Sequence, residues 1–137
     1  MTAIPLRVLV VDDDELVRMA THHALSDAGH VVTQAEDGAR ALELIREHAF
    51  DVAICDVRLP KVDGMTLFRT IRRQAPDTAV IVITSHAEVK DALECLQEGA
   101  SDYLTKPVHS APLLRRMQRI GARIAARKQR TEVGAKG

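Results

Sequence analysis

Five short apolar runs alternate with helix-patterned segments along this chain, and that alternation constrains its fold more than any other feature. Each run is four to six residues long, rich in β-branched side chains and closed by turn-forming residues. Strict alternation with short connections indicates a parallel sheet with helices on both faces. The expected strands cover residues 6–11, 31–35, 52–55, 79–83 and 101–105.

Helical periodicity fills the segments between these strands. The first helix has Asp14 as its N-cap and should stop near Gly29, which suits the left-handed position after a helix. Its pattern consists of Leu16, Met19, Ala20, His23 and Ala24, and later helices are expected around residues 41–45 and over 64–74, 87–98 and 110–127.

The length of 137 residues suits one domain with one core. No apolar run reaches the length of a membrane span, and the N-terminus lacks the basic start and long apolar stretch of a secretory signal. We therefore expect a cytoplasmic protein without membrane contact, in which Cys55 and Cys95 stay reduced and bind no metal.

Charge is distributed unevenly, although the net charge is zero. Residues 113–137 carry a net +7 and residues 1–112 a net −7. We expect a domain over residues 1–127 and a basic, flexible C-terminal tail over residues 128–137. Such a tail suits a partner-binding segment or a linker.

Polar side chains follow four of the expected strands at their carboxyl ends. They are Asp12 and Asp13 after the first strand, Asp56 after the third, Thr84 after the fourth and Lys106 after the fifth. Parallel strands bring their carboxyl ends to one edge, where open α/β sheets bind ligands. Crowded carboxylates raise each other's pKa unless a cation intervenes, and Mg²⁺ prefers such oxygen ligands. A metal, a hydroxyl and an ammonium group can together hold a phosphoryl group, which a carboxylate can accept as an acyl phosphate.

In these residues, and over roughly residues 4–127, the chain resembles the receiver domain of two-component response regulators. The matching residues are the acidic pair Asp12 and Asp13, the acceptor Asp56, the switch hydroxyl Thr84, the pair Lys106–Pro107, the switch aromatic Tyr103, and Pro60 and Gly64 after the acceptor. The resemblance implies a flavodoxin-like, doubly wound five-stranded parallel sheet of order 2-1-3-4-5, flanked by five helices. It also implies a cis peptide bond between Lys106 and Pro107.

The resemblance further implies a phosphorylation-activated signalling switch. Asp56 would accept a phosphoryl group from a phosphohistidine of a sensor histidine kinase or a phosphotransfer protein. Mg²⁺ would be held by Asp12, Asp13, Asp56 and the backbone carbonyl of Arg58, whose side chain would be free to vary. Lys106 and Thr84 would serve the transfer, and Thr84 and Tyr103 would relay it to the fourth helix, fifth strand and fifth helix. Such a domain catalyses only its own phosphorylation and dephosphorylation, so it is not an enzyme acting on other substrates.

Three other classes of protein fit parts of this pattern. A haloacid-dehalogenase-like phosphatase would use Asp12 as nucleophile and Asp14 as acid–base, but it needs Thr or Val at Leu16 and an acidic motif after the lysine. A flavodoxin-like flavin binder needs a hydroxyl- and glycine-rich loop where the acidic run lies. A nucleic-acid binder would use the basic tail, but no recognition-helix unit follows, so direct DNA binding is not expected.

The fifth helix carries an apolar seam made of Leu113, Met117, Ile120 and Ile124. Its first two turns should pack on the sheet. A helix over residues 110–127 would be about 27 Å long, whereas strands span roughly 17–20 Å, so its last turns should project. We expect this segment to be a linker toward an effector in a longer regulator, or a contact in a homodimer formed through the fourth helix, fifth strand and fifth helix.

Overall fold

Within residues 4–136, which are those that the computed structural model describes, five parallel strands form one sheet. Side chains are described as far as residue 130, and residues 1–3 and 137 of the predicted domain and tail lie outside the described residues. The strand order is 2-1-3-4-5, as the resemblance implied. The strands are β1 (Arg7–Val11), β2 (Val31–Ala35), β3 (Val52–Asp56), β4 (Ala79–Thr84) and β5 (Asp102–Thr105).

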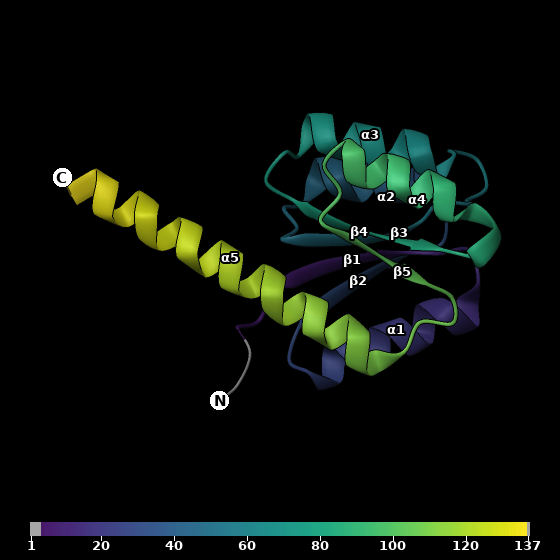
Figure 1. Ribbon diagram of the computed structural model, residues 1–137, viewed down its shortest axis with the longest axis horizontal. Coiled ribbons are helices and arrows are strands. Elements are labelled where there is room, and N and C mark those ends of the chain that lie inside the picture. Colours follow the sequence, from purple (N-terminus) through teal and green to yellow (C-terminus); the bar gives the residue numbers. More distant parts are fainter. Residues whose placement is uncertain (1–3, 137) are drawn as a thin grey trace.

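Helices cover both faces of the sheet (Figure 1). One face carries α2 (Gly38–Glu47), α3 (Gly64–Gln74) and α4 (Val89–Gln97), which follows a short 3-10 turn, η1 (His86–Glu88). The other face carries α1 (Glu15–Asp27) and α5 (Ser110–Lys136). No helix in the described part of the chain is long and apolar enough to cross a membrane.

Alternation along the central strands supplies a separate core to each face. Leu9 and Ala53 pack with apolar side chains of α2, α3 and α4, whereas their neighbours Val8 and Val52 pack with those of α1 and α5. Both faces of β3 are therefore buried, as its continuous apolar run predicted.

Aspartates start three of the helices. Asp14, Asp37 and Asp63 each accept a backbone N–H of the first turn, at 2.8–3.3 Å. The predicted end of α1 is also confirmed, because Gly29 has a φ of 95° that few other residues adopt readily.

The expected apolar pattern of α1 does not face the core. Leu16 is 80% exposed and Met19 44% exposed, whereas Thr21 and Leu25 are the buried residues of this helix. Thr21 can be buried because its hydroxyl donates to the carbonyl of Val17 at 2.8 Å. The buried stripe of α1 is therefore offset around the helix from the expected one.

The predicted end of α5 near Arg127 is wrong, because the helix continues to Lys136. The residues after Ile124 are mostly alanine, arginine, lysine and glutamine, which favour helix, and no proline stops them. Figure 1 shows this part of α5 extending well past the sheet, as expected. The seam itself packs in the core, with exposed fractions of 0% to 8% for Leu113, Met117, Ile120 and Ile124.

Candidate functional site

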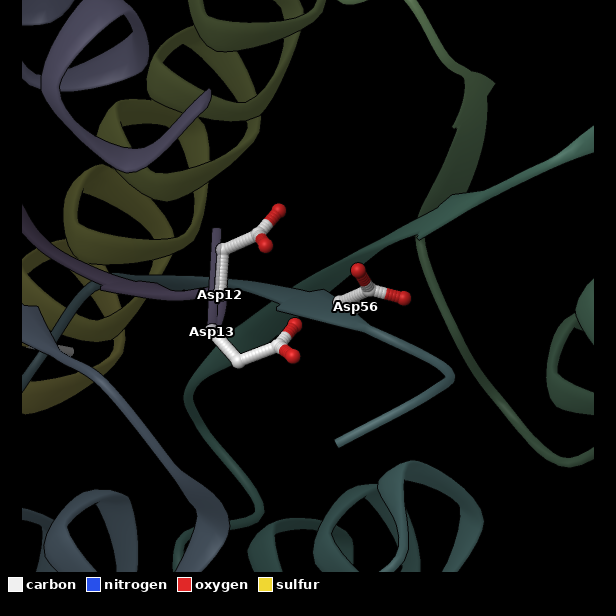
Figure 2. Close-up of side chains that lie close together, drawn as sticks. All are labelled: Asp12, Asp13 and Asp56. Carbon is white, nitrogen blue, oxygen red and sulfur yellow. The ribbon is translucent and has the colours of Figure 1, made fainter. Parts of the chain in front are cut away.

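Three carboxylates gather at the carboxyl edge of the sheet (Figure 2). Strands β1 and β3 are neighbours in which Val11 pairs with Cys55, so Asp12 and Asp56 occupy adjacent positions at the strand ends. One carboxylate oxygen from each of Asp12, Asp13 and Asp56 lies within 4.8 Å of the others. Asp12 and Asp56 are buried, and Asp13 is exposed.

Backbone amides fix the two buried carboxylates. Asp12 Oδ1 accepts the N–H of Asp14 at 2.9 Å, and Asp56 Oδ1 accepts the N–H of Arg58 at the same distance. Arg18 donates to the backbone carbonyl of Asp12 at 2.8 Å and so holds the loop after β1. Each carboxylate keeps its second oxygen for other partners.

Lys106 supplies the cation of the site. Its Nζ lies 2.5 Å from Asp56 Oδ2 and 3.4 Å from Asp12 Oδ2. The lysine is positioned by its N–H, which donates to the carbonyl of Thr84 at 2.8 Å, and is followed by the expected cis bond to Pro107.

Burial and charge set the protonation of this cluster. Burial raises the pKa of Asp12, and the charge of Asp56 adds to the rise, although the Asp14 amide and Lys106 oppose it. Burial acts to lower the pKa of Lys106, but its hydrogen bond to Asp56 and the two carboxylate charges outweigh that effect and raise it. Lys106 therefore stays protonated, and this one ammonium group faces three carboxyl groups.

The donor set suits a hard cation. All three candidate ligands are carboxylates, and an octahedral ion such as Mg²⁺ is held by one or two carboxylates plus water and phosphate oxygens. Cys55 adjoins Asp56 in sequence, but it lies in the core under α2, α3 and α4, and burial raises the pKa of its thiol to about 12. It offers no thiolate to the site, in agreement with the expectation of a buried, reduced cysteine.

The two expected switch residues lie near this rim but do not bind its carboxylates. Thr84 is fully buried, and its hydroxyl donates to the carbonyl of Ser85 at 3.1 Å. Tyr103 is half-buried on β5 and lines an open cavity together with His86 and Lys106. Their roles in switching remain predictions.

Two residues near the acceptor make side-chain contacts that the sequence did not predict. The resemblance implied that the Arg58 side chain is free to vary, but its Nε lies 2.8 Å from Glu88 Oε1. Lys61 has a φ of 68° and places its Nζ 3.0 Å from Asp37 Oδ2. Both contacts tie the loop after β3 to neighbouring helices, and neither partner could be chosen from spacing alone. The carbonyl of Arg58 as a metal ligand remains a prediction.

Gly64 is required by a close approach. A Cβ added there would lie 2.4 Å from the carbonyl oxygen of Val57 and 2.5 Å from that of Asp56. Helix α3 therefore begins directly against the acceptor end of β3, which only glycine permits.

Asp14 distinguishes between two of the candidate functions. Its Oδ1 accepts the N–H groups of Leu16 and Val17, so the carboxylate is engaged as the cap of α1. That engagement disfavours the acid–base role that a haloacid-dehalogenase-like phosphatase would need.

Known proteins resemble this chain over most of its length. A family model described as the response regulator receiver domain matches residues 8–118. The response regulator MprA of Mycobacterium sp. (strain KMS) is 38% identical over 117 residues, which are 85% of this chain and 51% of that protein. The chain spans about half the length of the curated relatives it matches.

Solved structures agree in fold. The structure of NtrX from Brucella abortus has a TM-score of 0.88 at 27% identity and covers 95% of this chain and 30% of its own. The isolated receiver domain of NtrX has a TM-score of 0.80 at 31% identity and covers 84% of this chain and 98% of its own.

Proposed function

Because this chain belongs to the response regulator receiver family and is a phosphorylation-activated switch of two-component signalling, we propose that Asp56 is its phosphoacceptor. One observation carries the assignment. Asp56 is buried at the carboxyl edge of the sheet, with Lys106 on one oxygen and two further carboxylates within 4.8 Å.

The proposed donor is a phosphohistidine of a sensor histidine kinase or a phosphotransfer protein. An oxygen of Asp56 attacks the phosphorus, the P–N bond breaks, and the imidazole leaves with the bonding electrons. The product is an acyl phosphate on Asp56. Lys106 stabilises the negative oxygens of the transferred group because its ammonium already lies at the acceptor.

Mg²⁺ is the proposed cofactor, held by Asp12, Asp13, Asp56 and the backbone carbonyl of Arg58. When bound, it would neutralise charge that develops on the phosphoryl oxygens. The residues fit such an ion because the cluster has three carboxylates but only one ammonium group among the described contacts to balance them.

Thr84 and Tyr103 are the proposed relay. The Thr84 hydroxyl would leave the Ser85 carbonyl and donate to a phosphoryl oxygen, and Tyr103 would follow it inward. This movement would bias the packing of α4, β5 and α5 between two states. We infer that the domain modifies only itself, acts on no other substrate, and works in the cytoplasm, where its kinase would present the donor histidine.

The output is proposed to run through α5. The longer NtrX structure aligns with 95% of this chain, whereas the isolated NtrX receiver aligns with 84%. This difference supports a connecting helix that continues past the end of a receiver alone. A homodimer through α4, β5 and α5 is the alternative. Sedimentation with and without a phosphoryl mimic separates the two, because a monomer at all concentrations in both states removes the dimer.

The acceptor is tested by mass measurement after incubation with acetyl phosphate and Mg²⁺. The wild-type chain should gain one phosphoryl group, and Asp56→Asn should gain none. Asp51→Asn is the matched control, because Asp51 precedes the same strand at its opposite end and its side chain accepts only the N–H of Arg7 within the described contacts. A phosphoryl group that persists in Asp56→Asn would overturn the assignment, and a chelator should stop the reaction in the wild-type chain.

A further inference from the structure

Two arginines from the β3–α3 segment hold opposite ends of α4. Arg58, in the loop after β3, places its Nε 2.8 Å from Glu88 Oε1 and its Nη2 4.0 Å from Asp91 Oδ2. Glu88 directly precedes α4, and Asp91 lies in its first turn. These acids stand at the N-terminal end of the helix, which favours negative charge.

Arg69, on α3, holds the other end. Its Nε donates to Glu98 Oε1 and its Nη2 to Glu98 Oε2, both at 3.0 Å, and Nη2 also reaches Glu94 at 3.2 Å. This bidentate pairing is the strongest hydrogen-bonding geometry between an arginine and a carboxylate.

Backbone hydrogen bonds from Glu98 and Gly99 close the C-terminal end of α4, but few side chains fix its first turn. Its buried residues are Ala92 and Cys95, near the middle, and Leu93 is 48% exposed. No side-chain hydrogen bond caps its N-terminus. The first turn of α4 has no buried side chain before Ala92 to position it, so its position depends mainly on the Arg58 ion pairs.

The two arginines differ in their connection to the acceptor. The backbone N–H of Arg58 donates to Asp56 Oδ1 at 2.9 Å, so this residue binds the acceptor through its backbone and α4 through its side chain. A phosphoryl group would add up to two negative charges and three acceptor oxygens to the carboxylate that the Arg58 backbone already binds. It would compete with Glu88, which holds the arginine by a single close contact.

We propose that Arg58 is a clasp that holds the first turn of α4 in the unphosphorylated protein and releases it when Asp56 is phosphorylated. Arg69 is the fixed attachment about which the helix then moves. Arg58 is a positioning residue in this scheme. The release rests on the proposed function of Asp56, whereas the clasp in the resting protein does not.

Hydrogen exchange of backbone amides, measured by NMR, tests the resting clasp. The amides of residues 92 and 93 close the first turn of α4. Arg58→Ala should speed their exchange about two- to fivefold, the range expected from losing an exposed ion pair. Arg69→Ala is the matched control and should instead speed exchange of the Glu98 amide, which bonds the Glu94 carbonyl.

Charge reversal separates the ion pair from a general structural effect. Arg58→Glu and Glu88→Arg should each speed exchange in the first turn, and the double variant should restore wild-type rates. Wild-type exchange in Arg58→Ala, or no restoration in the double variant, would overturn the clasp.

Beryllofluoride with Mg²⁺, a mimic of the acyl phosphate, tests the release. In the wild type, the first-turn amides of α4 should exchange faster when the mimic is bound, and Arg69→Ala should keep that increase. In Arg58→Ala these amides already exchange faster without the mimic, and the mimic should cause no further increase. An equal response in Arg58→Ala and wild type, with Asp56 modified in both by acetyl phosphate, would refute the release alone. Absence of modification in the wild type would refute the proposed acceptor, while the resting comparison would still decide the clasp.

Discussion

Helices α5 and α4 flank opposite faces of the sheet and are held there by different forces. Helix α5 buries a seam of four large apolar side chains, whereas α4 buries one alanine and one cysteine and is fixed at its ends by arginines. Each buried leucine, isoleucine or methionine contributes about 1.5–3 kcal/mol. Exposed ion pairs contribute much less and weaken in salt. The contacts at the ends of α4 should therefore break at a lower cost in free energy than the buried seam of α5.

The same truncation in the two helices gives the largest contrast. Leu113→Ala, in the fully buried seam of α5, should lower the free energy of unfolding by about 2–5 kcal/mol. Leu93→Ala, on the exposed side of α4, should change it by less than about 0.5 kcal/mol. Urea denaturation measures both, and equal losses would contradict the proposed difference between the helices.

Alanine at Gly121 should stabilise helix α5 itself. A Cβ there would meet only Leu6 Cδ1, at an ordinary 3.8 Å, and glycine inside a helix costs about 1 kcal/mol relative to alanine. Gly121→Ala should therefore raise the free energy of unfolding by about 0.5–1 kcal/mol. Gly64→Ala, the same change where a Cβ would strike two carbonyls, should lower it, and a loss at both positions would refute the packing described for α5.

The acidic rim should destabilise the metal-free protein at neutral pH. Burial raises the pKa of Asp12, so the folded carboxyl holds its proton to a higher pH than the unfolded one does. The ionised group therefore costs stability above that folded pKa. As pH falls toward about 4, where the unfolded carboxyl is also protonated, the cost disappears.

Asp12→Asn in chelator-treated protein should accordingly be more stable than wild type at pH 7 and equal to it in acid. Lys106 keeps Asp56 as a partner in this variant. Asp13→Asn removes the same charge at an exposed position and should give a smaller gain. Urea denaturation as a function of pH measures these differences, and a gain for Asp12→Asn that grows on acidification would contradict the assignment.

The smallest expected effect concerns the Arg69 attachment of α4. The hydrogen bond from Arg69 lowers the pKa of Glu98, so this carboxylate stabilises the fold above its ordinary pKa and stops doing so as pH falls through the lowered one. Glu98→Gln should lower the stability slightly at pH 7. The difference should vanish in acid and shrink in molar salt. A loss that is unchanged by either condition would show that the contact is not electrostatic.

The sequence predicted the parts of the site that follow from topology. Once the strands are parallel, Asp12, Asp56 and Lys106 must reach the same edge, and the structure brings them into contact. The strand order itself came from the resemblance to a known family, because alternation alone does not choose among the possible orders.

What the sequence could not predict depends on rotation and on long side chains. In α1, Leu16 and Leu25 lie on different stripes, and only packing decides which stripe is buried. In α5, no residue signals an end, so the helix continues past Arg127. The partner of Arg58 depends on where α4 begins in space, which spacing along the chain does not determine.

The extension of α5 gives the molecule a mechanical property. Twelve helical residues follow Ile124, the last of the buried seam, and span about 18 Å without a proline to bend them. Figure 1 shows them leaving the sheet as one continuous rod. A tilt of about 10° where the seam meets the sheet would carry the far end through about 3 Å. A small repacking at β5 and α5 would thus be amplified into a larger displacement at the far end of α5.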